Sequence, residues 1–148
     1  ICSIEMIEAV GQAFWPEYFA TIARLLKHGG KACVQSIVID DALFERYIHS
    51  TDFIQQYIFP GGCLPCPKEF QAQAERAGLR IVDDMSFGLD YAETLRRWRL
   101  KFLEEKSKVL QLNFDVRFMR IWEFYLCYCE AAFEEKNIDV VQYTLEKV

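Results

Sequence analysis

The sequence predicts an α/β fold, a sheet with helical covers, in one domain that spans residues 1–148. Short runs rich in β-branched residues alternate with segments whose apolar residues recur at helical spacing, and this alternation favours such a sheet. The 148 residues are 52% hydrophobic and 26% charged, which is enough for one buried core. No internal repeat, low-complexity run or linker interrupts the chain, so a single folding unit is expected.

The first half of the chain predicts two strands and two or three helices. Residues 1–6 are typical of a short strand, and residues 8–11 of a turn after it. A helix is expected from Pro16, because proline suits the start of a helix, to the glycine pair at 29–30. Residues 32–39 are apolar and β-branched, as in a buried central strand. Residues 41–57 carry apolar residues at helical spacing and predict one or two helices over the sheet.

The segment that follows is punctuated by proline and glycine. Residues 59–67 contain three prolines and two glycines, which neither a helix nor a central strand tolerates, so we expect a loop there. Residues 67–77 predict a helix that stops at Gly78. In residues 79–85 apolar and polar side chains alternate, which predicts a strand.

The last third of the chain predicts two helices and a closing strand. Asp90 and Glu93 have the spacing of a capping box, which starts a helix. That helix would bury Leu95, Trp98 and Phe102. After residue 113 a longer helix carries one apolar stripe, formed by Phe118, Ile121, Trp122, Tyr125, Cys129 and Phe133. Residues 140–145 predict a strand that closes the sheet.

Charge and hydropathy exclude several classes of protein. The 22 acidic and 17 basic side chains give a formal charge of -5, which repels nucleic-acid phosphates, so we expect no nucleic-acid role. No apolar run approaches the ~20 residues of a membrane-spanning helix, and the amino end has no signal-peptide pattern. A soluble, cytoplasmic protein is expected. The chain begins within a strand-like segment and without Met, which predicts a fragment or a truncated reading frame.

Six cysteines leave one alternative open. In a chain without signs of secretion they predict buried thiols rather than a disulfide framework. The Cys63-Leu-Pro-Cys66 spacing suits a redox or zinc site, with Cys127 and Cys129 as further ligands. Those two lie in an apolar helical stripe, however, and no second such pair or histidine accompanies them. We therefore expect no metal, and keep zinc as the alternative.

Six segments in a fixed order carry a resemblance that covers nearly the whole chain. Together they are similar to the cyclopropane fatty acid synthases and the related mycolic acid cyclopropane synthases. These segments are residues 3–11 (SIEMIEAVG), 35–37 (QSI), 57–65 (YIFPGGCLP), 87–98 (FGLDYAETLRRW), 125–130 (YLCYCE) and 142–145 (QYTL). One motif alone would be weak, whereas their ordered spacing is specific.

The resemblance implies the C-terminal part of a class I S-adenosylmethionine-dependent methyltransferase, with a Rossmann-like sheet. This chain would supply the last four of seven strands. The glycine-rich turn that approaches the cofactor and the acidic residue that holds its ribose belong to the other half, and no Gly-x-Gly-x-x-Gly occurs here. The chain by itself is therefore expected to bind S-adenosylmethionine weakly or not at all. The implied substrate is the unsaturated acyl chain of a phospholipid or another lipid, with peripheral contact to a membrane.

The resemblance also assigns roles to individual residues. In the family a bound bicarbonate ion removes a proton from the added methyl group. Glu8 matches the carboxylate that contacts this ion, Ile37 the backbone amide that donates to it, and Tyr91 the phenol that hydrogen-bonds it. Two adjacent anions must share a proton, so Glu8 is expected to have a raised pKa. Gln35 stands where the best-known members have histidine; it donates a hydrogen bond but carries no charge, which puts cyclopropane formation in doubt.

Further positions match the cofactor and acyl sites. Ile4 matches a strand residue that contacts the cofactor. The residues that match the acyl channel are Phe59, Leu95, Tyr125 and Cys129. An alkene is a poor nucleophile, so the reaction needs a dry channel that brings the methyl donor close, and aromatic faces that stabilise the carbocation.

Each of these residues also has an interpretation without catalysis. Glu8 would cap the turn after the first strand, Tyr91 would be a half-buried packing residue, and Phe59 would anchor the loop to the core. The basic cluster, Arg96, Arg97, Arg99 and Lys101, would be a solvated helix face rather than a site for lipid phosphates.

The sequence therefore leaves two candidate functions. The first is a methyltransferase portion, inactive by itself; the second is a non-catalytic module that self-associates through an exposed strand edge.

Overall fold

The computed structural model describes all residues from 1 to 148, and its centre is one four-stranded mixed sheet. The strands are β1 (Cys2–Ile4), β2 (Lys31–Ile39), β3 (Leu79–Ser86) and β4 (Ile138–Lys147), in the spatial order β1-β2-β4-β3. β1 runs parallel to β2, while β4 is antiparallel to both β2 and β3. The predicted α/β class is confirmed, and the long pairing of β2 with β4 makes those two strands the centre of the sheet.

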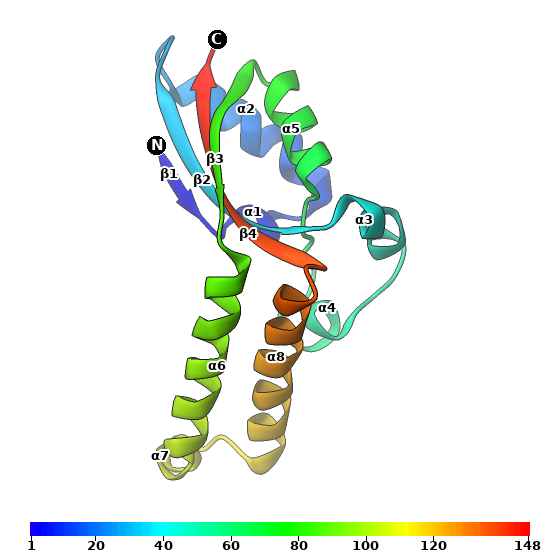
Figure 1. Cartoon of the computed structure of the whole chain (residues 1–148), viewed down its shortest axis with the longest axis vertical. Coiled ribbons are helices and arrows are strands. Elements are labelled where there is room, and N and C mark those ends of the chain that lie inside the picture. Colours follow the sequence, from blue (N-terminus) through cyan, green and yellow to red (C-terminus); the bar gives the residue numbers. More distant parts are fainter.

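Two helices cover one face of the sheet and form the main core with it (Figure 1). They are α2 (Trp15–Leu25) and α5 (Pro67–Arg76). Phe19 and Phe70, one from each helix, pack edge to face with ring centroids 5.0 Å apart, and Phe70 stacks on Tyr143 of β4. Both phenylalanines are fully buried. Burial of such rings is the main favourable term for this half of the molecule.

The other helices lie toward one end of the sheet. A helical hairpin of α6 (Gly88–Glu104) and α8 (Val116–Glu134) projects beyond the sheet, with α7 (Lys106–Gln111) at its far end (Figure 1). The short helices α1 (Ile7–Val10), α3 (Asp41–Ile48) and α4 (Phe53–Tyr57) follow β1 and β2 along the chain, and a 3₁₀ turn, η1 (Gln12–Phe14), precedes α2. None of the helices combines the length and apolarity that crossing a bilayer requires.

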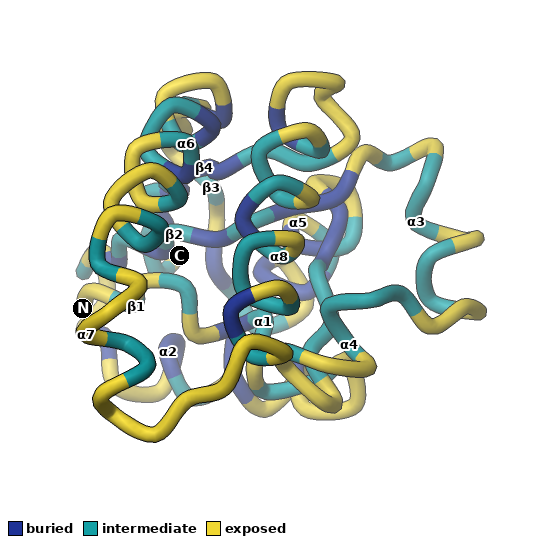
Figure 2. The backbone as a smooth tube through the Cα atoms, turned by 90° about the horizontal axis from the view of Figure 1, so that it is seen from below, coloured by how far each residue is buried: buried dark blue, intermediate teal, exposed yellow.

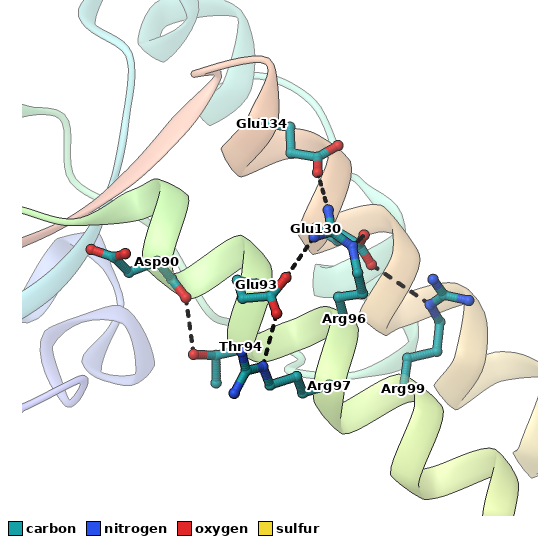
Figure 3. Close-up of polar contacts among 8 residues, drawn as sticks. All are labelled: Asp90, Glu93, Thr94, Arg96, Arg97, Arg99, Glu130 and Glu134. Atoms are coloured by element: carbon teal, nitrogen blue, oxygen red, sulfur yellow. Dashed lines mark hydrogen bonds and ion pairs between the residues drawn. The ribbon is translucent and has the colours of Figure 1, made fainter.

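Ion pairs join the two helices of the hairpin (Figure 3). Arg96 on α6 donates to Glu130 on α8 at 2.8 Å, and it also pairs with Glu134 and with Glu93. Arg99 lies 3.6 Å from Glu130. Because the Glu130 side chain is only 12% exposed, its charge needs these partners. The network fixes how α6 and α8 lie against each other.

The start of α6 differs from the prediction. The helix begins at Gly88 rather than Asp90, and no side chain of its own sequence caps it. Asp139 of β4 accepts from the Gly88 amide at 2.8 Å, so the cap comes from a distant strand. Glu93 pairs with arginines instead of reaching back to the helix start. The predicted capping box is therefore wrong, because the Asp139 carboxylate, from a strand distant in the sequence, accepts from the Gly88 amide at the start of the helix.

Several boundaries also differ from the prediction. Residues 8–11 were expected as a turn, yet Ile7–Val10 is a helical turn. β1 ends at Ile4, before Glu5, whose φ of 49° is incompatible with a strand. Residues 41–57 form two helices, of which α4 has a true capping box between Asp52 and Gln55. Trp98, expected to be buried on α6, is 53% exposed. The short helix α7 was not predicted.

Candidate functional site

A cavity of about 530 Å³ lies where α6, α8, α3 and α4 meet the end of the sheet. Its volume is in the range of small-molecule sites, and most of its lining residues are hydrophobic. Figure 2 shows that the hairpin helices around it carry mostly half-buried and exposed residues. Seven of the residues singled out in the sequence line this cavity: Glu8, Ile37, Phe59, Leu95, Tyr91, Tyr125 and Cys129. The fold therefore brings together residues up to 121 positions apart in the sequence.

Glu8 is held by the strand that it faces. Its Oε1 accepts from the Ile37 amide at 2.6 Å, while its Oε2 is buried without a hydrogen-bond partner. Burial raises the pKa of this carboxyl above its ordinary value, and the charge of Glu5 adds to the rise. The expected direction is found. Its main cause, however, is desolvation rather than an adjacent anion.

Glu5 is the residue that sequence reasoning missed. One oxygen of its carboxylate accepts from Gln35 Nε2 at 2.7 Å, and the other accepts from the Tyr91 hydroxyl at 3.0 Å. Its amide also donates to the Gln35 carbonyl at 2.9 Å. The available signal was a carboxylate near the carboxyl end of the first strand, at the edge where open α/β sheets bind ligands.

The three other members of this hydrogen-bonded chain, Gln35, Tyr91 and Gln142, are neutral donors. Gln142 Nε2 donates to Gln35 Oε1 at 2.8 Å, which turns the Gln35 amino group toward Glu5. Gln35 itself is not among the residues that line the cavity, so it acts behind Glu5. Burial, followed by the charge of Glu5, raises the pKa of Tyr91. The phenol therefore stays protonated and remains a donor at neutral pH.

The predicted acyl-channel residues form the apolar wall of the cavity. The rings of Phe59 and Tyr125 meet edge to face with centroids 6.0 Å apart, across the loop and α8. Leu95, which also lines the cavity, is buried at 2% exposure. Burial raises the pKa of both Tyr125 and Cys129 to about 12, so neither carries charge at neutral pH. This wall is uncharged and partly aromatic, as an acyl chain requires.

Ile4, the predicted cofactor contact, lies outside the cavity. It is 57% exposed at the carboxyl end of β1 and lines a shallow groove with Met6, Phe14 and Leu25. An exposed apolar residue at the end of a parallel strand suits one wall of a nucleotide-type site. The cofactor contact assigned to Ile4 stays a prediction.

The residues present do not fit the bicarbonate ion that the resemblance implies. The three donors predicted for that ion already have acceptors within the protein. The Ile37 amide donates to Glu8, and the Tyr91 hydroxyl donates to Glu5. Gln35 also donates to Glu5, which leaves one N–H of its amino group. A second carboxylate, that of Glu5, thus lies where two of these donors, Gln35 and Tyr91, converge.

The cysteines do not gather into a metal centre. The structure contains no group of three or more His, Cys, Asp or Glu side chains placed to hold a metal ion, and all six cysteines are free. Burial raises the pKa of Cys66 to about 11, and it raises that of Cys63 as well. Protonated thiols are poor metal ligands and poor nucleophiles, so the zinc and redox alternatives gain no support.

Comparison with known proteins identifies the family of this chain. The family model described as "Mycolic acid cyclopropane synthetase" matches residues 1–143. The chain belongs to this family. Over 146 residues the chain is 43% identical to the tuberculostearic acid methyltransferase UfaA1 of Mycobacterium tuberculosis, covering 98% of this chain and 34% of that protein. It is 32% identical over 142 residues to the cyclopropane-fatty-acyl-phospholipid synthase of Escherichia coli K12, covering 96% and 36%.

Solved structures of the family superpose on nearly the whole chain. The cyclopropane synthase MmaA2 from Mycobacterium tuberculosis matches with a TM-score of 0.89 and 26% identity, covering 99% of this chain and 54% of that one. The synthase CmaA1 in complex with SAH and CTAB gives 0.89 and 27% over the same shares. The chain spans about a third of the length of the curated relatives above and about half of these structures. Its fold is that of the C-terminal part of these methyltransferases, as predicted.

Proposed function

We propose that this chain forms the acyl-binding and proton-accepting part of a methyltransferase that moves a methyl group from S-adenosylmethionine to an unsaturated acyl chain of a phospholipid or similar lipid. The observation that supports this function is an apolar, partly aromatic cavity with a hydrogen-bonded carboxylate and phenol on one wall. Membership of the family and the SAH-bound relative support the same cofactor.

When bound, S-adenosylmethionine supplies an electrophilic methyl group. The residues of this chain bind the alkene, stabilise positive charge and accept a proton. The wall of Phe59, Leu95 and Tyr125 holds the alkene and excludes water from it. Attack by the alkene leaves a carbocation, and the aromatic faces of Tyr125 and Phe59 stabilise positive charge through their quadrupoles. A carboxylate in the same cavity then accepts a proton.

Cofactor binding by the full-length gene product tests this proposal directly. Titration calorimetry is expected to show saturable binding of S-adenosylmethionine to that protein, and weak or no binding to residues 1–148 alone. A Tyr125→Leu variant is expected to bind the cofactor normally while losing most transfer to unsaturated phospholipid, measured by mass spectrometry of the product lipid. A full-length protein that ignores S-adenosylmethionine would remove the proposal.

Peripheral contact with a membrane belongs to the same proposal. The basic cluster on α6 (Arg96, Arg97, Arg99 and Lys101) is engaged by glutamates, so it is a poor site for lipid phosphates. The far end of the hairpin suits a bilayer better. Leu112, Phe114 and Val116 are exposed there, and none of the nearby Lys106, Arg117 and Arg120 has an ion-pair partner within 4 Å. Retention of wild-type protein but not Leu112→Glu on anionic phospholipid vesicles would support this contact.

The non-catalytic module stays the second candidate. The free edge of β1 and the apolar side chains beside it, among them Ile4 and Met6, favour association with a further strand. Homo-oligomer formation through this edge stays a prediction. A monomeric, well-folded species in analytical ultracentrifugation would count against it.

A further inference from the structure

We infer that the Glu5 carboxylate is the proton acceptor of the proposed reaction, in the place that the family resemblance gives to a bicarbonate ion. This inference rests on the proposed function and names the group that completes it. Bicarbonate and a glutamate side chain present the same chemical group, a carboxylate with two oxygen acceptors. Here that group is part of the chain, so no free ion has to be bound.

The hydrogen bonds around Glu5 support this assignment. Gln35 donates to one carboxylate oxygen at 2.7 Å and Tyr91 to the other at 3.0 Å, so the group is held from two sides. Gln35 and Tyr91 are two of the residues that the resemblance assigns to the bicarbonate ion. Glu5 also lines the cavity together with Phe59 and Tyr125, so its carboxylate faces the space proposed for the acyl chain.

The backbone shows that Glu5 is held in an unusual conformation. Its φ of 49° lies in the left-handed region, which non-glycine residues adopt only at a cost of free energy. The neighbouring strand holds this conformation, because the Glu5 amide donates to the Gln35 carbonyl at 2.9 Å. Both the backbone and the side chain of Glu5 are thus fixed by the same residue of β2. Such restraint is typical of groups whose position matters for function.

The other groups near Glu5 suit the role less well. One oxygen of Glu8 is engaged by the Ile37 amide, and the other is buried without a partner. Asp52 caps α4 through the Gln55 amide. Gln35 cannot take up a proton, and Tyr91 already carries one that it donates to Glu5. With neutral donors on both sides, the proton removed from the substrate ends on Glu5 itself.

The reaction balances with this single base. The π electrons of the alkene form the new C–CH₃ bond as the S–CH₃ bond breaks, which leaves a cation on the adjacent carbon. Glu5 then takes a proton from the added methyl group. The C–H electron pair either closes the three-membered ring onto the cationic carbon or, after a hydride shift from the methylated carbon to that cation, forms a methylene double bond. Neither route needs an oxidant or a reductant.

The test compares the full-length wild type with a Glu5→Gln variant in buffer freed of carbon dioxide. Wild-type turnover of unsaturated phospholipid is expected to be the same with and without added sodium bicarbonate. Glu5→Gln keeps the size of the side chain but not its basicity, so turnover is expected to fall by roughly 10²- to 10⁴-fold. Calorimetric binding of S-adenosylmethionine should stay unchanged, which separates lost chemistry from lost folding. The matched control is Glu75→Gln, an exposed residue on α5, with wild-type turnover.

A second variant tests whether the Glu5 carboxylate takes the place of a bicarbonate ion. Glu5→Gly removes the carboxylate and suits the left-handed backbone, since glycine adopts positive φ without strain. Gln35 and Tyr91 then regain free donors, so added bicarbonate is expected to restore part of the turnover of Glu5→Gly but not of Glu5→Gln. An active wild type that requires added bicarbonate, or an equally active Glu5→Gln, would overturn the inference and leave the proposed function standing. A wild type that transfers no methyl group would overturn both.

Discussion

The two ends of the molecule bury their apolar residues in different ways. Between the sheet and helices α2 and α5, sixteen buried residues form one continuous core, including Trp15, Phe19 and Phe70 at 0% exposure. Around the α6–α8 hairpin the buried apolar cluster contains only five residues, and it is flanked by half-buried aromatic side chains such as Tyr91, Trp122 and Tyr125. The first region uses its aromatic rings to stabilise the fold. The second keeps Tyr91 and Tyr125 beside a cavity, where the proposed acyl substrate would complete their packing.

Substitution in the main core should have the largest effect on stability. Phe70→Ala removes a fully buried ring that contacts both Phe19 and Tyr143. It is expected to lower the free energy of unfolding by about 3–5 kcal/mol. Urea unfolding followed by circular dichroism measures this change.

The matched substitution in the hairpin is Trp98→Ala. Trp98 is bulkier than Phe70, but it is 53% exposed at the edge of the cavity. Its removal is expected to cost about 1 kcal/mol or less, while weakening binding of the acyl substrate. Equal losses of stability in Phe70→Ala and Trp98→Ala would contradict the difference between the two regions.

A substitution where the two regions join should have an intermediate effect. A Cβ on Gly88 would lie 2.5 Å from Asp139 Oδ1 and 3.2 Å from the Phe133 ring. Gly88→Ala is therefore expected to push Asp139 away from the start of α6 and to lower the free energy of unfolding by roughly 1–3 kcal/mol. Thermal or urea unfolding checks the loss. Combining it with Asp139→Ala should cost less than the sum of the single changes, whereas strict additivity would argue against the steric cause.

The smallest expected effect is a change in pH dependence at Glu8. Its folded-state pKa is raised by burial, so the folded protein binds a proton more tightly than the unfolded chain does. This contribution to stability is fully present below the ordinary carboxyl pKa near 4.5 and is lost as pH rises through the raised value. Glu8→Gln keeps an acceptor for the Ile37 amide but no longer titrates. Unfolding free energies measured from about pH 4 to about pH 8 should decline less in the variant, and parallel profiles would refute the prediction.

Predictions from the sequence were more accurate for the sheet with α2 and α5 than for the α6–α8 hairpin. The apolar, β-branched run of residues 32–39 and the proline and glycine residues that bound the helices near 16–30 and 67–78 predicted the layered half well, because such signals act locally along the chain. The hairpin was predicted less accurately. A capping box was assigned to Asp90, and Trp98 was expected inside, since local spacing does not reveal which face of a helix borders a cavity.

Several of the predicted site residues lie together in the structure, but the hydrogen bonds among them differ from the prediction. The ordered motifs led to Glu8, Ile37 and Tyr91, and all three line one cavity. The hydrogen bonds among them were expected to run through an ion, whereas Glu8 contacts Ile37 directly and Tyr91 contacts Glu5. Glu5 was missed because its role depends on a backbone φ of 49° and on partners 30 and 86 positions away.

The sequence by itself determined the class of fold, the order of its main elements and the family, because the spacing of apolar residues and the order of the motifs can be identified in the sequence alone. Only the tertiary structure decided which carboxylate meets which donor. Hydrogen bonds act over about 3 Å. At that scale the pairing of Glu5 with Gln35 and Tyr91 depends on how β1, β2 and α6 are packed, and sequence spacing carries no such information.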